Sequence, residues 1–392
     1  MSFAVRSLLL SACIASFPAW GAYAPVPETD EGKDLIVKVR AAVAHDSNLF
    51  GSSSGAIATA VYTVAPSVSW NRSLTERTFF AAAYGVTLDR FDRRPGDKLL
   101  DSHDATIRLA HAFAASTVLD LNNSLMIARN PESLLAGVKV NTDQSFLRNQ
   151  FDGRFTAPVI PRLNATVKAR SALYQYRDGD LSRALDRAEN LLGLAADYAV
   201  LPEVKVVAEY RHQDIYYAKL GEAKNKLSDY VMAGADYELA RKFTLSGRAG
   251  LEWRSRRGER GATAPYAEFS GKYAYAQRSF VLGGLGYSLE ETSDTARFND
   301  SQALRAFVTV QHSVTALIAV SGSFSYEPST LQGRRGQADV GETTVRTGLT
   351  LSYLPTPKWL IAGSVDLDRA NSDDAVRNLR RTRISVNATR SF

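Results

Sequence analysis

The feature that most constrains the fold of this chain is a two-residue alternation of apolar and polar side chains, sustained from residue 35 to the last residue. In the first such segment, Leu35, Val37 and Val39 fall on one side, and Lys38 and Arg40 fall on the other. Successive side chains of a β-strand point to opposite faces. The pattern therefore predicts a strand with one apolar and one polar face.

Similar segments of about 10–16 residues recur along the chain and are separated by turn residues, as in transmembrane strands. We expect about 18 strands in one domain, near residues 35–43, 59–71, 76–92, 102–115, 117–130, 145–157, 162–177, 187–200, 202–217, 227–240, 242–255, 263–276, 278–291, 301–314, 316–327, 341–354, 357–370 and 379–392.

The connections between these segments alternate in length. Tight turns are expected at 71–76, 115–116, 160–162, 201–202, 241–242, 277–278, 313–315 and 355–357, and longer polar loops at 47–58, 93–101, 131–143, 178–186, 218–226, 256–262, 292–300, 328–340 and 371–378. Short turns at one rim and longer loops at the other predict an all-β fold, a single antiparallel up-and-down transmembrane barrel. The outer loops are short, so a long infolded constriction loop is not expected. A propeller would need four short strands per repeat, whereas each repeat here holds two long ones.

The apolar face indicates contact with lipid. No apolar run approaches the roughly 18 residues of a spanning helix, whereas mid-strand charges are almost absent from this face, where each would cost about 2–4 kcal/mol. His111 is the clearest misfit. Expected outward residues include Val204, Val206, Ala208, Leu245, Ala249, Leu251, Leu304, Ala306, Val308, Val310, Val345, Leu349, Leu351, Ile361, Val365 and Leu367. Aromatic residues beside the tight turns predict an interfacial girdle, made of Trp70, Phe80, Phe113, Phe155, Tyr198, Tyr237, Phe243, Phe280, Tyr353, Trp359 and Phe392.

The polar face is rich in charge, and we predict that it lines the lumen. The predicted pore-lining residues are Lys38, Arg40, Arg108, Lys168, Arg170, Lys205, Arg211, Arg248, Arg254, Arg305, Arg346, Arg383, Glu209, Glu252, Asp366 and Asp368. Two interpretations remain open: an ion-paired, solvated wall, or a water-filled passage that prefers anionic solutes. About 18 strands leave an aqueous channel unless something fills it. Five tyrosines could stack on sugar rings or sit in the girdle, namely Tyr174, Tyr176, Tyr230, Tyr266 and Tyr326.

Enzymatic sites are not indicated. The histidines show no H-E-x-x-H or other metal spacing, no G-x-S-x-G elbow occurs, and no cofactor or metal is expected. The net charge of +6 is spread along the segments and not massed in a patch, so nucleic acid is not an expected partner. The histidines are His45, His103, His111, His212 and His312.

The N-terminus has the pattern of a cleaved export signal. Arg6 supplies a positive region, 7–17 is apolar, and Ala22-Tyr23-Ala24 is an A-x-A cleavage site. A lipoprotein-like box at Cys13 is the alternative, but it would leave a hydrophobic region of only about six residues. The expected division is a signal peptide at 1–24, a periplasmic lead at 25–33 and the barrel at 34–392.

The last ten residues form an amphipathic strand. Ile384, Val386, Ala388 and the terminal Phe392 share one face. This segment resembles the closing strand of Gram-negative outer-membrane β-barrels, in which the terminal aromatic residue is read by the barrel-assembly machinery. Arg390 departs from the resemblance, because the third residue from the end is usually apolar or aromatic. An arginine at the membrane edge can extend into the headgroups.

Asp46-Ser47-Asn48-Leu49-Phe50 resembles the D-S-N-[LIV]-[FY] element of porin-like barrels, including the EpsL-type proteins associated with exopolysaccharide gene clusters. The resemblance implies a Gram-negative outer-membrane barrel that exports an exopolysaccharide or other polar polymer. Implied partners are outer-membrane lipid and lipopolysaccharide, the assembly machinery, polysaccharide and periplasmic export components. The alternatives are a passive diffusion porin for small polar or anionic solutes, and a structural or surface-binding barrel with a blocked lumen. None of these is an enzyme.

Overall fold

The computed structural model describes residues 34–128, 145–219, 224–239, 242–256, 261–292 and 297–392. The expected signal peptide (1–24), the lead (25–33), Cys13 and loop 131–143 lie outside these residues. The strands are β1 (Leu35–Asp46), β2 (Thr59–Thr75), β3 (Thr78–Phe91), β4 (Leu99–Ala114), β5 (Thr117–Ala128), β6 (Phe146–Ile160), β7 (Leu163–Tyr176), β8 (Arg187–Leu201), β9 (Val204–Tyr217), β10 (Lys226–Leu239), β11 (Phe243–Arg256), β12 (Ala262–Ala276), β13 (Ser279–Glu290), β14 (Phe298–Ser313), β15 (Ile318–Gly333), β16 (Val340–Thr356), β17 (Trp359–Ser372) and β18 (Leu379–Ser391). A helix, α1 (Gly179–Leu185), follows β7, and a 3-10 turn, η3 (Ala375–Arg377), follows β17.

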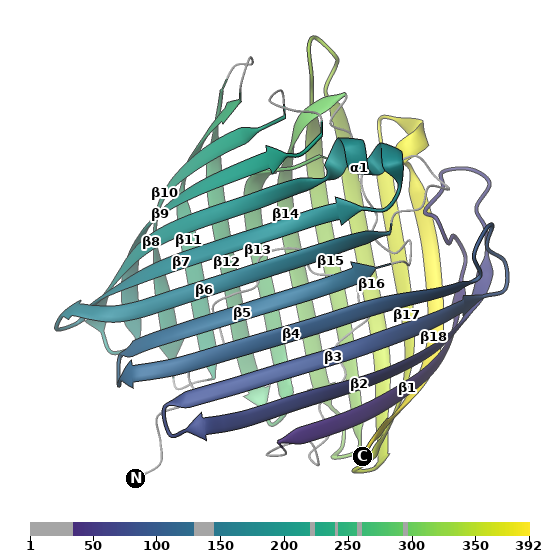
Figure 1. Ribbon diagram of the computed structural model, residues 1–392, viewed down its shortest axis with the longest axis horizontal. Coiled ribbons are helices and arrows are strands. Elements are labelled where there is room, and N and C mark those ends of the chain that lie inside the picture. Colours follow the sequence, from purple (N-terminus) through teal and green to yellow (C-terminus); the bar gives the residue numbers. More distant parts are fainter. Residues whose placement is uncertain (1–33, 129–144, 220–223, 240–241, 257–260, 293–296) are drawn as a thin grey trace.

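The eighteen strands close on themselves, as predicted. Each strand pairs antiparallel with its sequence neighbours, and β18 returns to pair with β1. Along this seam Ala41 is opposite Ala388 and Asp46 is opposite Arg383. Figure 1 shows the strands side by side around the barrel and tilted relative to its axis. Closure leaves no sheet edge with unpaired backbone groups.

The two rims differ as the sequence indicates. At one rim, consecutive strands are joined by tight turns, and this rim also carries the C-terminus (Figure 1). At two of these turns a non-glycine residue, Arg162 or Arg278, adopts a positive φ of 71° or 57°. The twist of a tight hairpin demands this backbone conformation. The other rim carries the longer loops, α1 and η3. In the described parts of the chain, no helix is long and apolar enough to cross a membrane.

Ion pairs that skip strands identify the inner face. Arg211 on β9 lies 3.1 Å from Glu268 on β12, and Lys226 on β10 lies 2.9 Å from Asp300 on β14. Neighbouring strands are about 4.8 Å apart, so such pairs close only on the concave side, where side chains converge. The alternate positions carry exposed apolar side chains, including Val206, Leu251, Val308, Leu349 and Leu367.

The aromatic girdle is present at the tight-turn rim, with one correction. Trp70 packs against Phe80 at 5.4 Å between ring centroids. His111 fits among these side chains, because it lies 4.5 Å from Phe113 and bonds Thr78 at 2.9 Å. The prediction for Phe280 is wrong. Its register places it on the inner face, where the Nζ atom of Lys272 lies 5.0 Å from its ring. The prediction was based on the short distance between Phe280 and a tight turn, and it did not consider which face of the strand this position occupies.

Candidate functional site

The inner wall of the barrel is the candidate site. All sixteen predicted pore-lining residues, twelve basic and four acidic, fall on the strand positions that face the lumen. Their side chains form networks and isolated ion pairs. Net charge remains on the inner wall only where a charged side chain has no partner of opposite sign.

One network crosses the lumen-facing side of β7 to β12. Glu209, 3% exposed, accepts hydrogen bonds from Lys168 at 2.9 Å and from Arg211 at 2.6 Å. Gly193 on the intervening β8 has no side chain, which leaves Lys168 a direct route to Glu209. Arg211 also donates to the Tyr266 hydroxyl at 3.0 Å and to Glu268 at 3.1 Å. Each cation in this network is matched by a carboxylate.

A second network lies below the long-loop rim, between β10 and β14. Lys226 donates to both oxygens of Glu291 at 2.8 Å and to Asp300 at 2.9 Å. Arg254 donates to Glu252 and Asp300, each at 2.7 Å. Glu252 and Asp300 are fully buried. Buried charges require such partners, because desolvation of an unpaired ion is costly.

Glu291 follows the end of β13 and anchors this network at the rim. Burial alone would raise the pKa of its carboxyl, but the charges of Lys226 and Arg254 and a hydrogen bond from the Tyr217 hydroxyl at 2.6 Å hold the pKa at about 2. The carboxylate therefore stays ionised throughout the neutral and mildly acidic range.

Further lumen charges form separate pairs across neighbouring strands. Arg108 pairs with Asp120, Arg170 with Asp152, and Arg248 with Asp236, at 2.6–2.8 Å, while Arg305 reaches both Glu290 and Glu327 at 2.7 Å. Arg383 lies 3.9 Å from Asp368. The ion-paired interpretation therefore holds for most of the predicted residues. Among the described residues, Arg40, Lys205 and Arg346 have no ion pair, so they carry unbalanced positive charge on the inner face.

Loop 47–58 is short, as expected, but it folds onto the inner face, which the sequence reasoning did not anticipate. Leu49 and Phe50, 1% and 7% exposed, pack against Val61, Phe91 and Leu100, all on the inner face. The loop is short, but two consecutive apolar side chains at its start draw it inward, because burying each is favourable by about 1.5–3 kcal/mol.

Polar contacts fasten the same loop. Asp46 forms a buried, bidentate ion pair with Arg381 on β18. The Asn48 amide donates to the Ser52 and Arg380 carbonyls at 2.8 and 3.1 Å and accepts from the Ser52 amide at 2.9 Å. The Asp46–Phe50 element is therefore the anchor of the loop.

Helix α1 was missed by sequence reasoning, which assigned 178–186 to a loop. Asp178 caps its N-terminus by accepting from the amides of Asp180 and Leu181. Leu181 and Leu185, one turn apart, pack on the inner-face Tyr176. An Asp cap followed by apolar residues at i and i+4 is the signal that could have identified this helix.

Of the two roles left open for the five tyrosines, stacking on sugars in the lumen does not apply to Tyr326, which faces outward and is 41% exposed. The other four lie on the inner face, where neighbouring side chains cover them. Leu181 and Leu185 pack on Tyr176, and the Tyr230 and Tyr266 rings contact each other. The Arg187 guanidinium lies 4.2 Å from the Tyr174 ring centroid, for example. No free aromatic platform for sugars results at these four positions.

The histidines take no part in the lumen, because their register places all five on the outer face. Within the part of the chain that the structure describes, no group of three or more His, Cys, Asp or Glu side chains is placed to hold a metal ion.

No family model matches the chain, and no curated protein matches it. Solved structures resemble it in fold. A BenF-like porin from Pseudomonas fluorescens Pf-5 superposes with a TM-score of 0.51 and 10% sequence identity, covering 92% of this chain and 99% of the other. OccK5 (OpdH) from Pseudomonas aeruginosa gives a TM-score of 0.49 at 11% identity and covers 92% of this chain and 98% of its own. OccAB4 from Acinetobacter baumannii gives a TM-score of 0.47 at 10% identity and covers 93% of this chain and 100% of its own. The closed barrel of this chain is thus the fold of the BenF-like porin.

Proposed function

We propose that this protein is a channel of the Gram-negative outer membrane for passive diffusion of small polar solutes, with a preference for anions. The observation that carries the proposal is the division of the closed barrel into an apolar, exposed outer face and a charged inner face. A barrel of about 18 strands is wide enough for an aqueous channel. The fold shared with the BenF-like porin supports the same function, and the pattern at 1–24 supports export by a cleaved signal peptide.

Export of an exopolysaccharide has less support. The residues that carry the resemblance to EpsL-type proteins, Asp46 to Phe50, have a structural role here, because they anchor loop 47–58. They are therefore accounted for without a polymer.

Solute flux through the purified, folded barrel tests the proposal. In planar bilayers we expect stepwise conductance, with a reversal potential under a salt gradient that indicates anion preference. In swelling assays, liposomes that contain the barrel should admit monosaccharides and small organic anions and exclude dextrans. Passage of dextran would favour polymer export. A folded barrel without current would favour the structural or surface-binding alternative.

A further inference from the structure

Two arginines face outward next to each other near the long-loop rim. Arg369 on β17 lies directly opposite Arg380 on β18, and both side chains are exposed. Opposite residues of an antiparallel pair have Cβ atoms about 4.5–5.5 Å apart, and like charges at that spacing are destabilising. Other outward charges near this rim, such as Arg90, Asp101 and Asp229, have no like charge directly opposite them, so a pair of this kind requires an explanation.

Neither arginine is neutralised by a carboxylate. The Nε atom of Arg369 donates to the Asn371 side-chain oxygen at 3.2 Å, and the Arg380 side chain makes no hydrogen bond, ion pair or ring contact with the described residues. The outward residue opposite Arg369 on β16 is Val345, and the next outward residue to Arg380 along β18 is Thr382. Arg380 lies beyond the last registered pair of β1 and β18, Asp46 with Arg383. The pair is therefore an unbalanced double positive charge.

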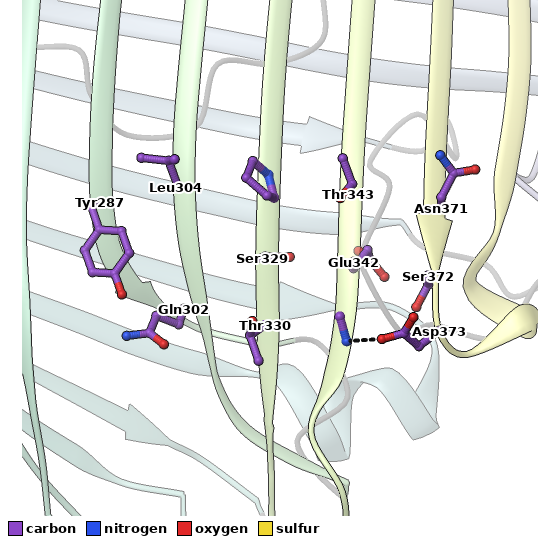
Figure 2. A pocket seen from close by; sticks show the side chains of 12 residues that line it. Tyr287, Gln302, Leu304, Ser329, Thr330, Glu342, Thr343, Asn371, Ser372 and Asp373 are labelled. Atoms are coloured by element: carbon purple, nitrogen blue, oxygen red, sulfur yellow. Dashed lines mark hydrogen bonds between the residues drawn. The ribbon is translucent and has the colours of Figure 1, made fainter.

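A groove of about 530 Å³ adjoins the pair on the same outer face, across β13 to β17. Figure 2 shows Thr343 and Asn371 at one level of the lining, Gln302 and Thr330 at another, and the Tyr287 ring between the two levels. These side chains offer hydroxyls, amides and one aromatic ring. The lining also includes two carboxylates: Glu342 pairs with Arg377 at 2.8 Å, and Asp373 accepts a hydrogen bond from the Gly341 amide at 3.0 Å. Asn371 belongs both to the groove and to the arginine pair, because it accepts the hydrogen bond from Arg369.

The position of the pair relative to the apolar belt indicates the ligand. The next outward residue on β17 away from the rim is Leu367, followed by Val365, and β18 continues from Thr382 to Ile384; the three apolar side chains are exposed. In a membrane these side chains meet acyl chains, so the arginines lie at the level where the charged headgroups begin.

We propose that Arg369 and Arg380, with the adjoining groove, bind the phosphorylated saccharide headgroup of an outer-leaflet glycolipid. Two guanidinium groups match a phosphate, which accepts bidentate hydrogen bonds. The groove supplies amide and hydroxyl partners for sugar hydroxyls, and the Tyr287 ring supplies a face for a sugar ring. This inference rests on the proposed outer-membrane location.

Binding to the full-length barrel in detergent micelles tests the site, with a lipid-anchored, bisphosphorylated glucosamine disaccharide as the probe. Arg369→Gln with Arg380→Gln should weaken binding at least about tenfold, the loss of one charge-assisted hydrogen bond or more. Asn371→Ala should weaken it less. Arg90→Gln is the matched control, because Arg90 is also outward, exposed and near the long-loop rim, and it should bind as the parent does.

Three further arms identify the source of the chemistry. The dephosphorylated disaccharide lipid should bind the parent as weakly as the phosphorylated lipid binds the double variant. If inorganic phosphate binds the arginine pair as well as the glycolipid probe does, the pair is a free-anion site. If phosphatidylglycerol binds as well as the probe, the pair recognises any anionic lipid. Either result overturns the proposal. A double variant that binds the probe as the parent does would also overturn it. The same holds for a double variant that loses self-association and keeps lipid binding. Conductance of the same preparations is measured separately, so a barrel that conducts but shows no difference between variants contradicts this inference alone.

Discussion

Arg390 lies on the outer face at the tight-turn rim, between the rings of Trp359 and Phe392. Its guanidinium carbon is 5.6 Å from the first ring centroid and 4.8 Å from the second. Cation–π contacts of this kind are favourable by about 0.5–1 kcal/mol at exposed sites. The residue that departs from the usual pattern of closing strands therefore joins the girdle through its charge, in place of an apolar side chain.

We expect Arg40 and Lys205 to contribute to anion preference, since both face the lumen and neither has an ion pair among the described residues. Arg40→Glu with Lys205→Glu should shift the zero-current potential under a salt gradient toward cation preference. Arg40→Lys with Lys205→Arg keeps the charge and should leave the potential unchanged. Reversing the charge of a paired cation such as Arg248 is a poorer test, because the substitution also breaks its ion pair with Asp236. An unaltered potential in the double Glu variant would exclude these two positions as selectivity determinants.

Glu291 makes stability depend on acidity. The pKa of its carboxyl in the folded protein, about 2, is below the ordinary value of 4.5. Its ionised form therefore stabilises the fold fully above pH 4.5, and this stabilisation is lost as the pH falls toward 2. Glu291→Gln should lower the free energy of unfolding at pH 7 by about 3 kcal/mol, and the difference from the parent should shrink below pH 4.5.

Urea unfolding of the vesicle-inserted barrel at several pH values measures this difference. Glu203→Gln, at an exposed position in a tight turn, is the control and should behave like the parent throughout. A deficit in Glu291→Gln that stays constant from pH 7 to pH 3 would show that the carboxylate is not the stabilising form.

At the scale of elements, loop 47–58 and α1 both fold toward the lumen at the same rim. We expect the loop to narrow the mouth. Leu49→Ser with Phe50→Ser removes its apolar anchors, so the loop should detach, single-channel current should rise and become noisier, and a protease should cleave within 47–58. Val376→Ser, in η3 at the same rim and 69% exposed, should change none of these. Parent-like current together with easy proteolysis would show that the loop is anchored as described but does not limit flow.

The strands were predictable and these rim elements were not, for a physical reason. A strand with one face toward an apolar phase must alternate over its whole length, so β9 or β16 is legible in isolation. Loop 47–58 and α1 are directed by only two apolar side chains each, Leu49 with Phe50 and Leu181 with Leu185. Which face receives them depends on strands distant in sequence. The same holds for the candidate site, because strand parity placed Arg211 in the lumen but could not show its pairing with Glu268, three strands away.

At the scale of the whole molecule, closure depends on the seam between β1 and β18, whose registered pairs include Ala41 with Ala388. Opposite residues have Cα atoms about 4.5–5.5 Å apart, within the range that a disulfide spans. In a Cys13→Ser background, Ala41→Cys with Ala388→Cys should therefore oxidise to one intramolecular crosslink without loss of conductance. Under denaturing, non-reducing electrophoresis the product should migrate differently from the reduced chain, because a loop of nearly the whole barrel has been closed.

Ala41→Cys with Asn387→Cys is the control, since these side chains leave opposite faces of the wall, and it should not crosslink. Crosslinking of the control pair in place of the first would place the seam one residue out of register and reverse the assignment of Arg383 to the lumen, whereas crosslinking of neither would mean that the barrel closes elsewhere.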